Sequence, residues 1–435
     1  MVNKLEKIGE KRIPGFSQLL SKRPDQFSRE FWPKYYSKAK GTYIWDLDGK
    51  KYLDFSFSGI GANVLGYADS DVNKKVKKSI DMGSSSSINC YEEAELAELL
   101  CEMHKWADMV RYSRSGGEAV SIAIRIARTY SNKDKVLFCG YHGWSDWYLA
   151  SNINEKSNLD NHLLPSLKSS GIPKALEGTA IPFNYNNLEE FKVLFRKNIK
   201  SLGCVIMEPV RTVKPNNGFL ETISEMCKKN KVPLIFDEIS SGFRICPGGS
   251  HLKFNVNPDI AVFAKAIGNG YPISAIIGSK EVMSSAQDTF ISSTNWTERV
   301  GSVAALATIK KFQDNNVHEH IHKMGKKVQN FWKEMDKKYN LKLDVSGLYQ
   351  LSYMAFQEDN DIKKTFFVEQ MLHRGVLAST RYYPNFAQND SHFRLYKKNA
   401  EIVFKNIADL SKRKDKSLEN AIEGSISKPG FKRYA

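Results

Sequence analysis

Ala261-Val-Phe-Ala-Lys-Ala-Ile-Gly-Asn-Gly270 decides the fold, because it places a lysine, Lys265, between a short apolar strand and a glycine-rich turn. A second apolar strand lies upstream in Pro233-Leu-Ile-Phe-Asp-Glu-Ile-Ser-Ser-Gly-Phe-Arg244, and Asp237 stands at its end. In sheets of parallel strands, ligands bind at the carboxyl ends of the strands. The two stretches therefore predict a site at which an amine and a carboxylate meet.

An amine and a carboxylate at two strand ends are the pair that pyridoxal 5′-phosphate requires. The lysine forms an imine with the cofactor aldehyde, and the carboxylate keeps the ring nitrogen protonated so that the ring accepts electrons. Taken singly, a lysine after a strand is usually a loop residue, and an aspartate there is often a helix cap. We predict Lys265 and Asp237 as catalytic residues because further motifs complete the same site.

The first of these motifs is a turn of small residues that opens a helix, Ser113-Arg-Ser-Gly-Gly-Glu-Ala-Val-Ser-Ile-Ala-Ile-Arg-Ile-Ala-Arg128. Backbone N–H groups at a helix start bind anions, and glycines allow a ligand to approach closely. We therefore predict that Ser115, Gly116 and Gly117 hold the cofactor phosphate. Glu118 falls in the first turn, where a carboxylate complements the helix dipole.

The second motif, Cys139-Gly-Tyr-His-Gly-Trp144, follows a strand and offers Tyr141 between glycines as a flat surface for the cofactor ring. Such a stack contributes roughly 1 kcal/mol beyond burial. Ile239 follows Asp237 by two residues, so in an extended chain it projects to the same side and packs on the opposite ring face. His142 is predicted to be a hydrogen-bonded structural histidine rather than a ligand.

Residues that contact the substrate are less well defined by the sequence. Phe57 and Ser58 follow a predicted hairpin and are candidates for the substrate pocket. Arg381 either clamps a carboxylate with two hydrogen bonds or lies on the surface. Glu208 ends the strand Val205-Ile-Met-Glu, where it either borders the substrate or forms a salt bridge at a loop start.

The order of predicted elements indicates an α/β fold with a large and a small domain. Between residues 110 and 290, short apolar strands alternate with helices, which is typical of a mostly parallel sheet covered by helices. We predict an N-terminal arm and hairpin (1–70) that packs with the small domain, a large cofactor-binding domain (71–305), and a small C-terminal α+β domain (306–435) with a loose basic tail from Ser411. The expected strands are Gly41–Phe55 (a hairpin), Val136–Cys139, Cys204–Met207, Pro233–Phe236, Ile260–Phe263 and Leu351–Phe356. The expected helices are Tyr91–Trp106, Arg299–Asn315 and Val317–Tyr339.

Composition excludes several classes of protein. Hydrophobic residues make up 41% and charged residues 26% of the 435 residues, as in ordinary globular chains. No apolar run is long enough to span a membrane, the start does not resemble a signal peptide, and six scattered cysteines indicate free thiols in the cytoplasm. The lysines behind the net charge of +16 are spread along the chain, so we predict anionic small molecules rather than nucleic acid as partners. His318, His320 and His322 cluster without a further ligand, so no metal is predicted.

Together the motifs resemble the class III pyridoxal-phosphate-dependent aminotransferases, and within them the glutamate-1-semialdehyde 2,1-aminomutases. The matching stretches are 115–119, 141–143, 207–209, 236–239 and 264–270, with an N-terminal hairpin at 43–54. The resemblance implies fold type I, the aspartate-aminotransferase-like fold, with a sheet of the seven-stranded type beside a smaller α+β domain. It also implies a homodimer with its active sites at the subunit interface, in which 83–90 reaches the neighbouring site.

The resemblance further implies that a threonine from the partner subunit touches the phosphate. Thr297 fits by its offset from the following helix, and Thr294 is the other candidate. This segment has Trp-Thr-Glu-Arg where the family usually has a glycine and a proline, and the phosphate turn has Ser-Gly-Gly-Glu in place of Ser-Gly-Thr-Glu.

The expected activity is amino transfer between an amine or amino-acid donor and a keto or aldehyde acceptor, with Lys265 bonded to the cofactor and then moving protons. The alternative is migration of the amine within one molecule, as in the aminomutases. A non-catalytic scaffold with this fold and a basic nucleic-acid-binding protein are more remote alternatives.

Overall fold

The computed structural model describes the 435-residue chain except residues 1, 156, 163–166, 211, 414–416 and 429–435. Tertiary contacts divide the chain into two compact units, residues 70–318 and residues 1–69 with 319–435. The predicted division into an arm with a hairpin (1–70), a cofactor-binding domain (71–305) and a small domain (306–435) stays a prediction. None of the described helices combines the length and apolarity that crossing a bilayer requires.

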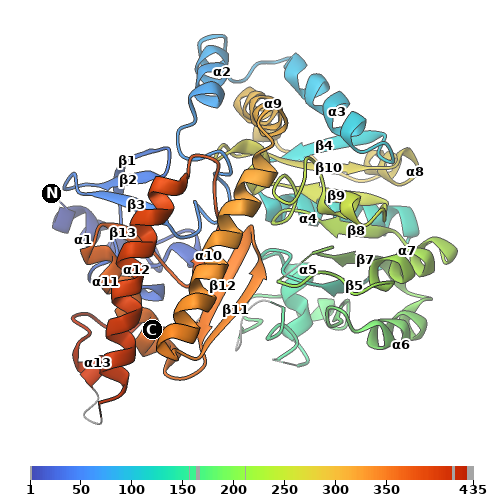
Figure 1. The fold of residues 1–435 in the computed structure, drawn as a ribbon. Coiled ribbons are helices and arrows are strands. Elements are labelled where there is room, and N and C mark those ends of the chain that lie inside the picture. The colour runs from blue at the N-terminus through green and yellow to red at the C-terminus, as the bar shows by residue number, and fades with distance from the viewer. Residues whose placement is uncertain (1, 156, 163–166, 211, 414–416, 429–435) are drawn as a thin grey trace. The chain divides into compact units, whose positions relative to one another are not determined.

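A seven-stranded sheet forms the centre of the 70–318 unit, in the order β4-β10-β9-β8-β7-β5-β6 (Figure 1). The strands β5 to β9 run parallel, and β10 is antiparallel to both of its neighbours. The predicted α/β class with a mostly parallel sheet is therefore confirmed. The strands are β4 Met109–Ser113, β5 Lys135–Cys139, β6 Ala180–Pro182, β7 Leu202–Met207, β8 Leu234–Asp237, β9 Ile260–Phe263 and β10 Ser274–Gly278.

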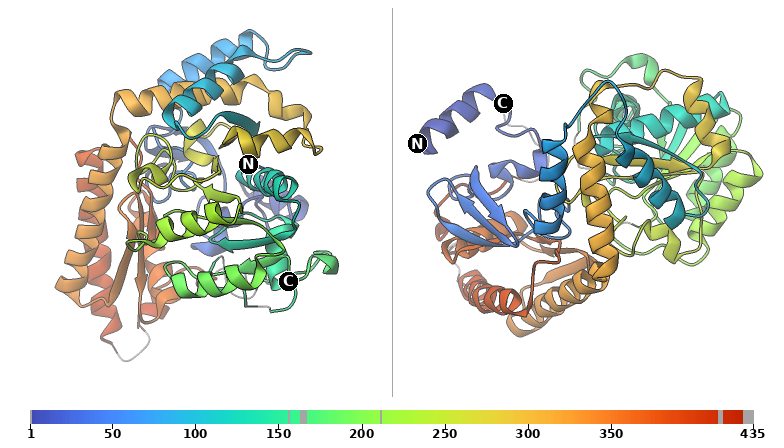
Figure 2. Two further views of the ribbon diagram at one scale, coloured as in Figure 1. Left: turned by 90° about the vertical axis from the view of Figure 1, so that its right-hand side faces the viewer. Right: turned by 90° about the horizontal axis from the view of Figure 1, so that it is seen from above.

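Alternating side chains of these strands form two apolar cores, one on each face of the sheet, which helices cover (Figure 2). Phe138, Ile206 and Ile235 pack against helix α4 (Gly116–Ser131) on one face. Their sequence neighbours Leu137, Val205 and Phe236 face helices α6 (Leu188–Asn198) and α7 (Phe219–Lys229) on the other. Because both faces are buried, the strands are continuously apolar rather than alternating, which is why their pattern was readable in the sequence.

Helices α2 (Ser70–Asp81) and α3 (Tyr91–Met103) each pack against α9 (Arg299–Asp314) in the same unit. Helix α3 ends three residues earlier than predicted. The cause is His104, the residue after its last turn, because the side chain of His104 is hydrogen-bonded through Nδ1 to the carbonyl of Leu100 and accepts the N–H of Gly249 at Nε2. Short helices complete the unit: α5 Asp146–Leu149, α8 Lys280–Met283, η3 Ala150–Asn152, η4 Lys174–Leu176, η5 Ser250–Lys253, η6 Lys265–Gly268, η7 Ser284–Gln287 and η8 Thr294–Thr297.

The other unit contains two small sheets and a core of its own. One sheet has the order β1-β2-β3-β13 and includes the predicted hairpin, while the other has the order β11-β12-β14. The strands are β1 Tyr36–Lys40, β2 Tyr43–Asp46, β3 Lys51–Phe55, β11 Leu343–Leu348, β12 Leu351–Phe356, β13 Val376–Ala378 and β14 Arg381–Tyr382. The helices are α1 Val2–Arg12, η1 Leu20–Lys22, η2 Pro24–Gln26, α10 Val317–Tyr339, α11 Asn360–His373, α12 Asp390–Ser411 and α13 Ser417–Asn420. Strand β1 lies in the region predicted as an arm, and part of the predicted loose tail lies outside the described residues.

Candidate active site

Lys265 lies two residues beyond the end of β9, at the start of η6. Its backbone has a positive φ of 50°, which an L-residue adopts only where the surroundings hold it. Its Nζ donates a hydrogen bond to Oγ of Ser240, at 2.7 Å. Burial lowers the pKa of Lys265 and the charge of Arg244 lowers it further, although Asp237 and Glu208 oppose both effects. The fold therefore favours the neutral, nucleophilic form of this amine more than water does.

Asp237 lies at the end of β8, the strand beside β9, and is 3% exposed. Its Oδ1 accepts the backbone N–H of Ile239 at 3.0 Å, and its Oδ2 lies 2.8 Å from Nδ1 of His142. The other ring nitrogen of His142 lies 3.3 Å from the carbonyl oxygen of Cys139. Because both ring nitrogens face acceptors, His142 holds the carboxylate in place. The predicted hydrogen-bonded role of His142 agrees with this geometry.

The start of α4 is built as the sequence suggests. Ser115 caps the helix, and Glu118 completes a capping box by accepting the N–H of Ser115 at 2.8 Å. Among the described residues, the N–H groups of Gly116 and Gly117 find no acceptor. Two free N–H donors at a helix N-terminus suit an anionic group such as a phosphate.

Both glycines of this turn lie too close to other groups to carry a side chain. A Cβ at Gly116 would lie 2.8 Å from Cδ1 of Ile239, and one at Gly117 would lie 2.9 Å from Nε1 of Trp144. Ile239 therefore links the carboxylate end of the site to the phosphate turn. The residues present leave a glycine-lined cradle between these side chains, which fits a phosphorylated cofactor.

Tyr141 and Glu208 lie beside Asp237. Tyr141 is 43% exposed, and burial together with the charges of Asp237 and Glu208 raises its pKa. Glu208 accepts the N–H of Tyr141 at 3.2 Å, and a Cβ at Gly140 would lie only 2.5 Å from its Oε2. Glu208 thus has a direct role in holding the Tyr141 turn, a role that neither predicted alternative included. Its contact with substrate stays a prediction.

The segment with the two threonine candidates is tied to the phosphate turn. The guanidinium of Arg114, next to Ser115, donates to the carbonyls of Asn295 (2.6 Å), Trp296 (3.0 Å) and Glu298 (2.5 Å). Thr297 and Thr294 are both exposed, and the hydroxyl of Thr297 donates to the carbonyl of Thr294 at 3.2 Å. Their contact with a phosphate stays a prediction.

Several residues of this site were missed by reasoning from the sequence: Arg114, Trp144, Ser240, Arg244 and Trp296. Arg114 carried a weak signal, because it directly precedes the predicted phosphate turn. Ser240 carried none, because a serine after a strand is ordinary in any loop.

The substrate candidates Phe57, Ser58 and Arg381 belong to the 1–69 and 319–435 unit. There the structure brings them together around two tyrosines. Ser58 donates its hydroxyl proton to the carbonyl of Tyr383 at 2.8 Å, and Phe57 packs in the same apolar cluster as Tyr383. The guanidinium of Arg381 lies 5.7 Å from the ring centre of Tyr353, whose hydroxyl is hydrogen-bonded to that of Tyr383.

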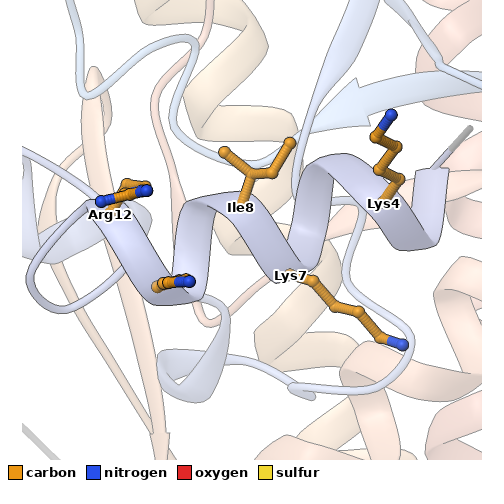
Figure 3. A pocket seen from close by; sticks show the side chains of 5 residues that line it. Lys4, Lys7, Ile8 and Arg12 are labelled. Carbon is orange, nitrogen blue, oxygen red and sulfur yellow. The ribbon is translucent and has the colours of Figure 1, made fainter.

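A separate hollow lies along α1, lined by Lys4, Lys7, Ile8, Lys11 and Arg12 (Figure 3). Its polar side chains are all basic, so it lacks a carboxylate such as the one that Asp237 provides near Lys265. None of the predicted site residues lines it.

A lysine and an aspartate after adjacent parallel strands, with a glycine turn opening a helix in the same unit, define a pyridoxal-phosphate-dependent transferase of fold type I. The family model for Aminotransferase class-III matches residues 28–393, and the chain belongs to this family. It is therefore an enzyme that uses pyridoxal 5′-phosphate, as the resemblance implied.

Two relatives differ in their named reactions. The chain is 34% identical to glutamate-1-semialdehyde 2,1-aminomutase 2 of Lachnoclostridium phytofermentans over 75% of this chain and 78% of that protein. It is 30% identical to 3-aminobutyryl-CoA aminotransferase of Cloacimonas acidaminovorans over 78% of this chain and 79% of that protein.

Solved structures share the fold at lower identity. The FumI protein of Sphingopyxis sp. MTA144, in its pyridoxal-phosphate internal aldimine form, has a TM-score of 0.85 at 22% identity, covering 94% of this chain and 96% of that one. An omega-transaminase from Sphaerobacter thermophilus has a TM-score of 0.82 at 22% identity, covering 93% and 97%.

Proposed function

We propose that this enzyme transfers an amino group between two molecules, an amine donor and a keto or aldehyde acceptor, with Lys265 as the proton-transferring residue. The observation that carries the proposal is the buried amine of Lys265 held by Ser240, with the carboxylate of Asp237 close enough to influence its pKa. A donor and an acceptor that bind in turn can use one such site for both half-reactions.

Residues of the 70–318 unit are proposed to hold the cofactor. Pyridoxal phosphate supplies, when bound, an aldehyde and a ring that accepts electrons. Lys265 would meet the aldehyde end and Asp237 the ring nitrogen. Tyr141 and Ile239 would flank the ring. The cap residue Ser115 and the N–H groups of Gly116 and Gly117 would bind the phosphate.

The proton steps are proposed to use the same few side chains. Nζ of Lys265 would remove a proton from the substrate carbon that carries the amine, and would then give a proton to the carbon of the former cofactor aldehyde. Burial lowers the pKa of Lys265 and so favours its neutral form, and Ser240 keeps Nζ in one position. Because His142 holds Asp237, the carboxylate would stay directed at the position proposed for the ring nitrogen of the cofactor.

The absorbance spectrum and the donor half-reaction test this proposal. Lys265→Ala should lose the visible band of the protein-bound cofactor and slow the half-reaction at least about 1000-fold. Lys280→Ala, which removes an exposed lysine of the same unit, is the matched control and should keep both. Turnover in Lys265→Ala at the control's rate would overturn the assignment.

Migration of an amine within one molecule is the second candidate, because one relative is named an aminomutase. With an amine donor alone, a transferase releases one product per active site and stops, whereas added acceptor restores turnover. A mutase instead converts glutamate-1-semialdehyde continuously into the isomer with the amine on the neighbouring carbon. Continuous turnover of that single compound, without turnover of separate donors and acceptors, would replace our proposal with the second candidate.

We also propose a homodimer in which Thr297 or Thr294 of one subunit contacts the phosphate bound by the other. Light scattering should then give about twice the chain mass of 49.4 kDa. Thr297→Val and Thr294→Val tell the two candidates apart by their effect on cofactor affinity, with a weakening of about 10-fold expected for the residue in contact. If a monomer retains full activity, the dimer proposal fails.

The six cysteines are free thiols, which supports the proposed cytoplasmic location.

A further inference from the structure

Trp144 places a large aromatic side chain beside the glycine turn that opens α4. Trp144 is 69% exposed, whereas a tryptophan is usually largely buried. A Cβ built on Gly117 would have three indole atoms of Trp144 as its nearest neighbours: Nε1 at 2.9 Å, Cδ1 at 3.2 Å and Cε2 at 3.7 Å. The edge of the indole that carries the N–H group therefore lies against the first turn of the helix.

The chain around Trp144 is held against α4. Oγ of Ser145 lies 2.6 Å from Oγ of Ser121, and the hydroxyl of Ser121 also donates to the carbonyl of Gly117 at 2.9 Å. On the other side of Trp144, a Cβ at Gly143 would lie only 3.1 Å from Cα of Gly117. Because the backbone is held on both sides, the indole lies beside the turn before any ligand binds.

The indole N–H of Trp144 has no acceptor in the part of the chain that the structure describes. The backbone N–H groups of Gly116 and Gly117 lack one as well. Three donors without acceptors, one of them from a side chain, thus lie together at the start of one helix. Such a group of donors suits an anion with several oxygen atoms.

The indole also takes a place that a side chain at position 117 would need. The family usually has a threonine in this turn, and this chain has Gly117, which brings no side-chain donor of its own. A threonine here would put its Cβ 2.9 Å from Nε1 of Trp144, so the two side chains exclude each other. The glycine therefore makes room for the indole N–H at the position where a hydroxyl is absent.

We propose that Nε1 of Trp144 donates a hydrogen bond to the phosphate of pyridoxal 5′-phosphate. This inference rests on the proposed binding of the phosphate by the turn of Ser115, Gly116 and Gly117, and it adds a side-chain donor to that turn. The phosphate would supply the acceptor that the chain does not offer to the indole. A hydrogen bond to a charged acceptor is stronger than one between neutral groups.

The affinities of the apoenzyme for pyridoxal phosphate and for pyridoxal test the proposal, because the two compounds differ only in the phosphate. Trp144→Phe keeps an aromatic ring and removes the N–H. It should weaken the binding of pyridoxal phosphate by about 10- to 100-fold and that of pyridoxal by less than about 2-fold. Trp144→His retains a ring N–H and should recover part of the loss. Unchanged affinity for pyridoxal phosphate in Trp144→Phe, or an equal loss for both compounds, would overturn the proposal.

A control and an exchange of donors complete this experiment. Trp106→Phe removes an indole N–H that donates to His251 at 3.1 Å, and should leave the ratio of the two affinities unchanged. Trp144→Ala combined with Gly117→Thr makes room for a Cβ at position 117 and offers a hydroxyl in place of the indole. This double variant should bind pyridoxal phosphate more tightly than Trp144→Ala alone. Equal binding by the two would overturn the inference that the indole replaces a hydroxyl donor.

Ser115→Ala separates a failure of this proposal from a failure of the proposed phosphate site. It removes the cap hydroxyl and should also lower the affinity for pyridoxal phosphate relative to pyridoxal. If Ser115→Ala has this effect and Trp144→Phe does not, the turn binds the phosphate without the indole and only the present inference fails. If neither variant changes the ratio, the phosphate site itself is wrong. Because only binding is measured, the result does not depend on whether the amine moves between molecules or within one.

Discussion

At the scale of single residues, the site depends on partners that orient its two central groups. Ser240 fixes the amine of Lys265, and His142 fixes the carboxylate of Asp237. Neither partner needs to touch a substrate, so each acts as a positioning residue. Their contributions can be measured separately because each makes one main hydrogen bond to the group that it holds.

The first prediction concerns His142. His142→Phe removes the 2.8 Å contact with Asp237, and a hydrogen bond to a charged group contributes about 1.5–3 kcal/mol. The donor half-reaction should therefore slow by about 10- to 100-fold in stopped-flow absorbance, with the cofactor still bound. His142→Asn retains a donor and should recover part of the rate. Equal rates in His142→Phe and the unmodified enzyme would contradict a positioning role.

The second prediction concerns His104, a buried residue whose Nδ1 lies 2.8 Å from the carbonyl of Leu100 and whose Nε2 accepts the N–H of Gly249 at 2.9 Å. Burial lowers the pKa of His104 to about 4, the charge of His251 acts in the same direction, and Glu238 opposes them. The unfolded chain, with a histidine pKa of about 6.5, binds more protons than the fold between these values. Stability is therefore lost as the pH falls from about 6.5 towards about 4.

Urea unfolding at pH 7.5 and pH 5 measures this effect. The His104 contribution should lower the free energy of unfolding by about 2 kcal/mol between the two pH values. His104→Gln cannot be protonated in this range, so its loss of stability on acidification should be smaller by that amount. If the variant and the unmodified enzyme lose stability equally, the prediction is wrong.

At the scale of elements, the phosphate turn and the start of α9 form one connected structure. Arg114 donates hydrogen bonds to three carbonyls of 295–298. Nε1 of Trp296 donates to Oε1 of Glu118 at 3.4 Å. Glu298 caps α9 by accepting the N–H of Val300 at 2.7 Å. The departure from the family pattern in this segment therefore has a structural reason. Trp296 and Glu298 are used to attach the segment to the turn that carries Ser115.

The third prediction tests this attachment. Arg114→Ala removes three charge-assisted hydrogen bonds and should lower the free energy of unfolding by roughly 2 kcal/mol. Arg125→Ala removes a single hydrogen bond from helix α4 to the carbonyl of Phe290 and should cost less than about 1 kcal/mol. Hydrogen exchange should rise at 294–299 in Arg114→Ala only. Unchanged exchange there would show that the segment holds its conformation without Arg114.

Elements with strong local signals were predicted well, and those set by distant partners were not. Strand β9, strand β12 and helix α10 have the predicted bounds, because long apolar periodicity and continuous apolar runs are local properties. Strand β1 was missed, since Tyr-Ser-Lys-Ala-Lys has no apolar face and is a strand only because β2 pairs with it.

At the scale of the whole molecule, we expect the net charge of +16 to speed the arrival of the anionic cofactor. A positive field speeds the association of anions, and salt screens it over a Debye length of about 10 Å at 0.1 M. The fourth prediction is that the association rate of pyridoxal phosphate with the apoenzyme falls roughly tenfold between low salt and 0.5 M salt. Pyridoxal, which lacks the phosphate, is the control and should show little change. The same salt dependence for both compounds would contradict steering.

The amino-acid sequence by itself determined the parallel strands, the helix that opens at Gly116, and the positions of Lys265 and Asp237 after two of those strands. These features follow from apolar runs, glycines and caps within about 15 residues of one another. Only the tertiary structure decided that His142 holds Asp237, that Ser240 holds Lys265, and that Ser58 lies against Tyr383, 325 residues away in the chain. Contacts at such separations depend on how whole elements pack, and no local pattern of residues encodes that packing.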